Sequence, residues 1–290
     1  MRRRSSLRLS AEDVSQGYAL ACQSVIEGDV AVTVPPQEKI ERRLTTDRTA
    51  IEVSVPPDYD PNYSQTVRRI SLRLAPPRMD DQTDDWSRLK TALRQKAGVE
   101  DIRISLNLLQ RLGDTLREKD WQVTAVTDAH IEVDGQRTDE RLVSLIADIV
   151  REDDPMYGLA IDIGTTTVTV WLVDLISGKV EAQASEYNSQ ISRGEDVISR
   201  IIFSSKNGGR EELQNRVLKT INLLIAQACK RVNARSQDIV KATVAGNSTM
   251  THLFLGIPAS SIRLSPFITA VNQPPTITAG TIGLAINTEA

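Results

Sequence analysis

The feature that most constrains the fold is a pair of short apolar segments joined by a turn of glycine and threonine, within residues 158–174. The first segment, 159–163, is apolar except for Asp162, and the second, 168–173, is rich in β-branched residues. Each segment predicts a strand, because such residues fit a pleated and partly buried surface. We therefore expect two strands that meet at a turn of unusual composition.

The turn carries groups suited to a phosphate. Gly164 permits a positive φ and a close approach of the backbone, while Thr165, Thr166 and Thr167 add hydroxyls and a row of exposed N–H donors. Asp162, at the end of a strand expected to be buried, is costly unless a cation or a set of donors meets it. These residues predict a site for phosphate and magnesium. The alternative is a hairpin with a threonine-rich turn and a surface aspartate.

Two further segments narrow the interpretation. Asp162-Ile-Gly-Thr-Thr-Thr167 resembles the first phosphate loop of the superfamily that contains acetate and sugar kinases, heat-shock chaperones and actin. Together with 188–201 (Asn-Ser-Gln-Ile-Ser-Arg-Gly-Glu-Asp-Val-Ile-Ser-Arg-Ile) and 245–253 (Ala-Gly-Asn-Ser-Thr-Met-Thr-His-Leu), in this order, it resembles the reductive activators of corrinoid proteins. That family joins a [2Fe-2S] ferredoxin-like domain, a linker, a middle domain and a large ATPase domain.

The resemblance implies ATP and Mg²⁺ as cofactors and a corrinoid protein as partner. It places phosphate on Gly164, Thr165, Thr166 and Thr167, and Mg²⁺ on Asp162 through water. Gly246 and Asn247 open a predicted helix whose N-terminus can receive an anion. The implied function is a one-electron reduction of Co(II) coupled to ATP, with no catalytic residue assigned. A small-molecule kinase of the same superfamily and a non-catalytic module that binds a corrinoid protein are the alternatives.

The sequence departs from the family pattern at both ends. Cys22 matches the last ligand of the family's [2Fe-2S] cluster, but a plant-type cluster takes four thiolates and the chain has two cysteines, Cys22 and Cys229. Cys22 alone is not expected to bind a cluster. A second phosphate loop does not occur before Ala290. We expect a chain truncated at both ends, with weak or absent ATPase activity.

The fold class expected is mixed, α+β followed by α/β. We assign 1–40 to a remnant of the ferredoxin-like domain and linker, 41–150 to a small α+β middle domain, and 156–290 to the first lobe of an actin-like ATPase domain, which is incomplete. The last range has the order strand, strand, strand, helix, helix, strand, helix, and the resemblance makes it a ribonuclease-H-like half domain. The pattern alone indicates only an α/β fold.

Periodicity predicts most elements of the first 155 residues. We expect strands over 29–34, 49–55 and 65–74, a helix from 10 to 20, and a helix from 84 to 97. A further helix over 104–119 is predicted to bury one stripe of leucines, namely Leu106, Leu109, Leu112 and Leu116. The segments 121–126 and 130–133 predict two strands paired with each other, and 137–155 predicts a helix. In 188–201, Glu195 and Asp196 begin a helix and Arg200 is placed to pair with either.

Composition limits the function classes. The net charge is −3, so no broad basic surface is implied and no nucleic-acid partner is expected. No apolar run approaches the roughly 20 residues that span a bilayer, and no apolar segment follows Arg2-Arg3-Arg4 to form an export signal. We therefore expect a cytoplasmic protein without a membrane partner. A homodimer is left open.

Overall fold

The structure, a computed structural model, describes residues 65–98, 100–133 and 140–290, together with isolated residues among the first 31. The chain forms two compact units, Met1–Arg43 and Leu44–Ala290. In the first unit, the two-residue strands β1 (Arg2–Arg3) and β2 (Ser24–Val25) pair antiparallel. The elements predicted for 10–20, 29–34 and 49–55 fall largely or wholly outside the described residues, and so does Cys22.

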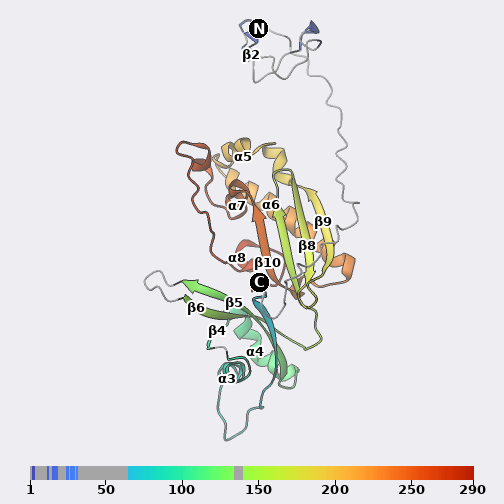
Figure 1. Cartoon of the computed structure of the whole chain (residues 1–290), viewed down its shortest axis with the longest axis vertical. Helices are drawn as coiled ribbons and strands as arrows, with labels where there is room; N and C mark the ends of the chain where they lie inside the picture. The colour runs from blue at the N-terminus through green and yellow to red at the C-terminus, as the bar shows by residue number, and fades with distance from the viewer. Residues whose placement is uncertain are drawn as a thin grey trace. The chain divides into compact units, whose positions relative to one another are not determined.

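The C-terminal sheet has the strand order β10-β7-β8-β9 (Figure 1). Strands β7 (Tyr157–Ile163), β8 (Thr167–Asp174) and β9 (Val180–Tyr187) run antiparallel in sequence, and β10 (Ile239–Gly246) returns parallel to β7. The helices are α5 (Val197–Ser204), α6 (Gly209–Val232) and α7 (Ser248–Phe254), with short α8 (Ala279–Ile282) near the end of the chain. This order and the mixed fold class agree with the prediction.

Helix α6 contacts β8 and β9, and their apolar residues form one core. In β8 the buried residues Val168, Val170 and Leu172 alternate with partly exposed ones, so one face of the sheet is buried and the other is more open. The buried residues of α6 that complete this core are Leu213, Val217, Ile221, Leu224, Ile225, Ala228 and Cys229. Helix α6 thus covers one face of the sheet that carries the candidate site.

The N-terminal sheet of the second unit has the order β3-β5-β6-β4. Its strands are β3 (Val67–Arg73), β4 (Asp101–Arg103), β5 (Gln122–Val133) and β6 (Glu140–Val150). The helices α3 (Asp85–Ala97) and α4 (Leu106–Glu118) join its core, and Asp84 and Ser105 cap their N-termini. None of the described helices is long and apolar enough to cross a bilayer.

Two predictions for this sheet are wrong. Residues 122–126 and 130–133 do not pair with each other, because they belong to the single strand β5, which pairs with β3 and β6; Trp121 precedes it in a turn. Residues 140–150, predicted as helix, form strand β6 between β5 and β4. Pairing on both sides determines the conformation of this segment, and such non-local pairing overrides local preference.

The predicted core stripe of α4 is half wrong. Leu112 and Leu116 are buried as expected, but Leu106 and Leu109 are 68% and 40% exposed, and Leu108 is buried instead. The buried stripe therefore repeats every four residues from Leu108.

The two sheets of the second unit are in contact near the start of β10. Lys241 donates from Nζ to both carboxylate oxygens of Asp128, at 2.8 and 2.9 Å. A small apolar cluster lies at the same junction; its buried members are Val67, Val126, Met156 and Val240. Asn287 of the C-terminal segment adds a hydrogen bond from Nδ2 to Asp148 Oδ2 at 3.0 Å. Strand β10 thus runs from this contact to the candidate site.

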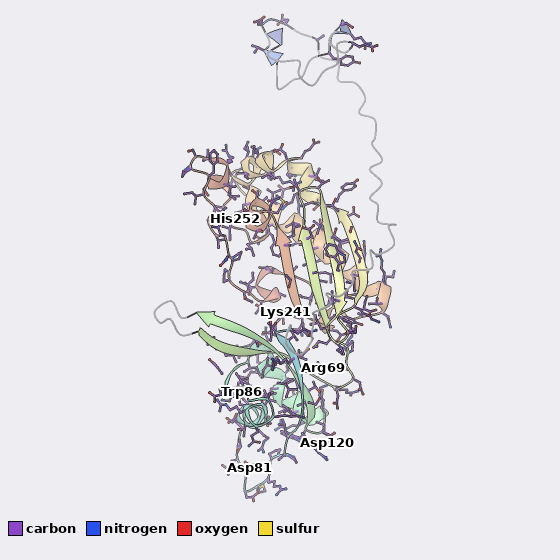
Figure 2. All side chains as sticks on the ribbon, viewed as in Figure 1. Arg69, Asp81, Trp86, Asp120, Lys241 and His252 are labelled. Atoms are coloured by element: carbon purple, nitrogen blue, oxygen red, sulfur yellow. The ribbon has the colours of Figure 1, made fainter. Side chains whose placement is uncertain are left out.

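We expect the loop before α3 to lose stability in acid through Asp81 (Figure 2). Hydrogen bonds from Thr83 and Arg88 lower the pKa of Asp81 from 3.8 to about 2. Because the pKa is lower in the folded state, the stabilisation is present above about pH 4 and is lost as the pH falls through about 2. Thermal unfolding of Asp81→Asn should show a lower Tm than wild type at neutral pH and the same Tm near pH 2. Asp80→Asn, the same charge change at an exposed neighbour, is the control; a Tm deficit of Asp81→Asn that persists near pH 2 would contradict the prediction.

Candidate phosphate-binding site

The sheet brings the two predicted phosphate segments together. β10 runs parallel beside β7, with Ala245 opposite Asp162 and Gly246 opposite Ile163. The two strands therefore end side by side, and the turn after β7 meets the start of α7 after β10. Asn247 Nδ2 lies 3.4 Å from Thr165 Oγ1 across this junction. Residues more than 80 positions apart thus line one edge of the sheet.

Three consecutive carbonyl groups of the turn accept hydrogen bonds from two buried residues. Gly164 O accepts from Asn188 Nδ2 at 2.9 Å, Thr165 O accepts from Arg200 Nη2 at 2.5 Å, and Thr166 O accepts from Asn188 N at 2.8 Å. Asn188 and Arg200 are both fully buried. The turn is therefore held by its carbonyl oxygens.

This arrangement determines where the N–H groups point. In a trans peptide the C=O of one residue and the N–H of the next are antiparallel, so the N–H groups of Thr165, Thr166 and Thr167 point away from the buried side. Within the described part of the chain, the N–H groups of Thr165 and Thr166 donate no internal hydrogen bond. Successive free N–H groups in a turn form a concave site for an anion. The backbone thus has the form of a phosphate cradle.

Of the two features predicted for Gly164, the left-handed φ is not found and the close approach of the backbone is. Its φ lies outside the left-handed region. Instead, a Cβ on Gly164 would lie 2.6 Å from Thr167 O, a backbone atom that accepts the Gly164 N–H at 2.9 Å. The close approach of two backbone segments, and not a left-handed conformation, requires glycine here.

Asp162 is exposed, which corrects the expectation that its carboxylate is buried. Its neighbours Ile161 and Ile163 are buried, so the alternation of β7 places Asp162 on the other face of the sheet. The argument from desolvation therefore does not apply. No group of three or more His, Cys, Asp and Glu side chains suited to a metal occurs among the described residues. Mg²⁺ commonly binds through one carboxylate, waters and phosphate oxygens, and an exposed Asp162 beside the cradle fits that mode.

Gly246 and Asn247 lie at the edge of the cradle. Asn247 is the N-cap of α7, since its Oδ1 accepts from Met250 N at 3.0 Å. The amide Nδ2 remains directed to Thr165. Gly246 approaches Ile163 closely, because a Cβ would lie 3.3 Å from Ile163 O. Both residues are exposed, so they are available to a ligand.

The predicted ion pair of Arg200 with Glu195 or Asp196 does not form. Asp196 is the N-cap of α5 and accepts from Ser199 N at 2.9 Å, and this backbone hydrogen bond lowers the pKa of Asp196. Arg200 instead points into the buried side of the turn. The sequence signal that could have indicated this is the run of polar residues in 188–200, of which Asn188, Gln190 and Arg200 are all fully buried.

Cys229 and His252 are both buried in the core of the C-terminal part of the chain. Burial raises the pKa of the Cys229 thiol, which lies in the core of α6. His252 of α7 is fully buried (Figure 2), with Nδ1 2.7 Å from Ser248 O and Nε2 accepting from Ala270 N at 3.0 Å. Both ring nitrogens are therefore occupied by backbone groups.

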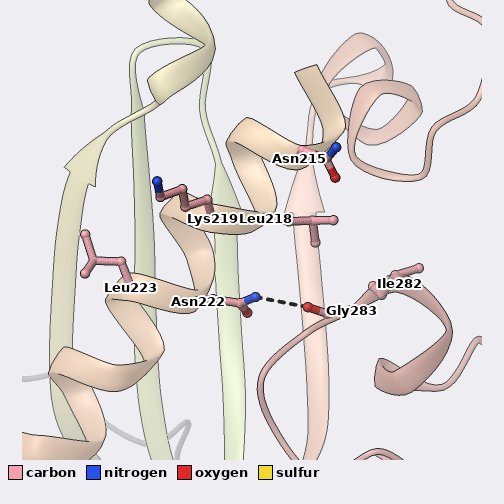
Figure 3. Close-up of a pocket in the computed structure, with 7 residues that line it drawn as sticks. All are labelled: Asn215, Leu218, Lys219, Asn222, Leu223, Ile282 and Gly283. Atoms are coloured by element: carbon pink, nitrogen blue, oxygen red, sulfur yellow. Dashed lines mark hydrogen bonds between the residues drawn. The ribbon is translucent and has the colours of Figure 1, made fainter. Parts of the chain in front are cut away.

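A cavity of about 630 Å³ lies elsewhere, between α6 and the segment around α8 (Figure 3). Its lining residues are Asn215, Leu218, Lys219, Asn222, Leu223, Ile282 and Gly283. Asn222 uses its amide within the protein, donating to Gly283 O at 3.0 Å and accepting from Ala285 N at 2.9 Å. None of the predicted site residues lines this cavity, and no sequence signal indicated it.

The fold defines the class first: a small mixed α/β sheet, followed by a second sheet of three antiparallel strands and one parallel strand, with a glycine–threonine turn at its edge. A family model for the RACo middle region matches residues 157–290, and one for the RACo linker region matches residues 59–147. The chain belongs to this family, the reductive activators of corrinoid proteins.

Known proteins agree with this assignment. The corrinoid activation enzyme RamQ of Eubacterium limosum is 38% identical over 142 residues, which is 48% of this chain and 23% of RamQ. The solved structure of a reductive activator for corrinoid, iron-sulfur protein has a TM-score of 0.69 at 34% identity, covering 99% of this chain and 45% of that chain. The archaeal actin homologue Ta0583 matches weakly, with a TM-score of 0.24 at 15% identity, covering 61% of this chain and 68% of that chain. This chain thus spans less than half the length of RamQ and of the solved activator.

Proposed function

We propose that this chain supplies the linker and a nucleotide-binding lobe of an ATP-dependent reductive activator, whose partner is a corrinoid protein. The phosphates of ATP bind the N–H groups of Thr165, Thr166 and Thr167, and Asp162 holds Mg²⁺ through water. Gly246 and Asn247 border the same site. Bound ATP supplies the free energy for an uphill one-electron reduction of Co(II). The observation that carries the proposal is the inward direction of three consecutive carbonyls, which leaves the N–H groups outward.

The residues of this chain do not fit a [2Fe-2S] cluster. The sequence has two cysteines, whereas such a cluster takes four ligands. Cys229 is buried in the core of α6, so it is not available as a ligand at a surface cluster. We therefore assign no electron-transfer step to this chain. We expect little or no ATP hydrolysis by it alone, because phosphoryl transfer depends on positioning and on exclusion of water. A homodimer, a cytoplasmic location and the absence of a nucleic-acid partner remain predictions.

The test is the Mg²⁺ dependence of ATP binding in Asp162→Asn. In wild type we expect Mg²⁺ to strengthen ATP binding. The variant should lose most of that gain, about tenfold, because it lacks the carboxylate that a Mg²⁺-bound water contacts. Without Mg²⁺ the variant should bind ATP as well as wild type or better, since a negative charge near the phosphates is removed. Calorimetric titration with and without Mg²⁺ measures both effects.

Glu181→Gln is the matched control. Glu181 is exposed on β9, near the end of the strand remote from the turn, and its substitution changes the net charge equally. It should leave both affinities unchanged. Absence of ATP binding in wild type, or an Mg²⁺ effect that survives in Asp162→Asn, would refute the proposed site. If a corrinoid protein binds equally with and without ATP and in Asp162→Asn, the chain is a non-catalytic interaction module instead.

A further inference from the structure

Arg200 is a fully buried cation whose hydrogen-bond partners are all neutral. Its Nε donates to Gly194 O at 2.9 Å, and its Nη1 lies 3.3 Å from both Gln190 Oε1 and Met250 Sδ. Its Nη2 donates to Thr165 O in the turn at 2.5 Å. The guanidinium therefore joins three segments of the chain directly beneath the cradle.

The charge of Arg200 has no contacting counter-ion. Among the ion pairs of the described residues, none includes Arg200. Burial lowers the pKa of Arg200, and Asp196 opposes this only through space. Buried charges are normally paired, because an isolated ion loses its hydration without compensation. A buried arginine that binds only neutral groups thus leaves positive potential at the turn.

The surrounding backbone is fitted to this side chain. The 3-10 helix Ser189–Arg193 carries Gln190 to the guanidinium, and Gly194 follows it. A Cβ on Gly194 would lie 2.5 Å from Ser199 Oγ and 2.8 Å from Arg200 N, so only glycine permits this approach. The segment 188–200 is thereby accounted for as a support for the turn.

We propose that Arg200 is a positioning residue for phosphate, which fixes the Thr165 peptide with the following N–H outward and attracts the ligand through its unpaired charge. This inference rests on the proposed function. It gives Arg200 an electrostatic role that does not depend on contact with the ligand. The hydrogen bond to Thr165 O affects every ligand of the cradle equally. The Coulomb interaction grows with the charge of the ligand, so it favours polyphosphates over monophosphate.

The experiment compares inorganic phosphate, pyrophosphate and tripolyphosphate as ligands of the full 290-residue chain. Calorimetric titration gives the affinity of wild type, Arg200→Met and Arg200→Lys for each ligand. Arg200→Met should weaken tripolyphosphate about tenfold and phosphate about twofold, so that the preference for the more charged ligand falls about fivefold. Arg200→Lys keeps the charge but not the planar fork, so it should weaken all three ligands by a similar factor and retain the preference.

Arg117→Met is the matched control. Arg117 lies on α4, beside the other sheet, its side chain is 54% exposed and paired with Asp85, and the substitution removes the same charge as Arg200→Met. It should preserve both affinity and preference. If wild type binds none of the ligands, the proposed function fails and this inference fails with it. If wild type binds and Arg200→Met keeps the preference, the role of Arg200 alone is overturned. Should Arg200→Met not fold, Arg200→Lys decides: retention of the preference supports the charge argument, and loss of the preference refutes it.

Discussion

Gly164→Ala should abolish most phosphate binding, with a loss of affinity for tripolyphosphate of about 100-fold. The new Cβ would lie 2.6 Å from Thr167 O, and both this atom and the glycine belong to the backbone. No side chain can move aside to relieve the contact. The turn must therefore open, which breaks the hydrogen bond from Gly164 N to Thr167 O and displaces the outward N–H groups. Calorimetric titration measures the loss.

Gly28→Ala separates this effect from the general effect of replacing a glycine. Among the described residues, none has an atom within 4 Å of a Cβ placed on Gly28, and the φ of Gly28 lies outside the left-handed region. We expect wild-type affinity for tripolyphosphate in this variant. Binding of Gly164→Ala within threefold of wild type would show that the turn tolerates a Cβ and that the close approach does not shape the cradle.

The C-terminal lobe could be predicted because its signals are local. In β7 and β8 the apolar residues have the spacing of the strand itself, and the start of α7 follows directly from Asn247. The position of the turn was likewise set by adjacent residues. The exposure of Asp162 could not be predicted in this way, because it depends on which face of the sheet α6 covers.

Two of the errors involve contacts between distant residues. β6 is a strand because β5 and β4 pair with it on either side, and nothing within 140–150 states this. Arg200 could form a local pair with Asp196, which the spacing favours, but it binds Thr165, 35 positions away, instead. Such contacts form only when the chain folds, so a local sequence pattern does not indicate them. The direction of the N–H groups in the cradle depends on these same contacts.

Asn188→Ala should lower the free energy of unfolding by about 3 kcal/mol. Asn188 is fully buried, donates from Nδ2 to Gly164 O at 2.9 Å, and accepts at Oδ1 from Gln190 N at 3.1 Å. Truncation leaves a carbonyl and an N–H without these partners, and each buried polar group left unsatisfied costs about 1–3 kcal/mol. Urea unfolding followed by circular dichroism measures the change.

Asn215→Ala provides the same truncation at an exposed position of α6 and should change the free energy of unfolding by less than about 0.5 kcal/mol. The comparison also tests how the cradle is held. Because the Asn188 side chain anchors Gly164 O while Arg200 anchors Thr165 O, Asn188→Ala should weaken phosphate and tripolyphosphate by the same factor, unlike Arg200→Met. A stability equal to that of Asn215→Ala would mean that water replaces the amide, and the turn would then owe its shape to Arg200 and the Asn188 backbone.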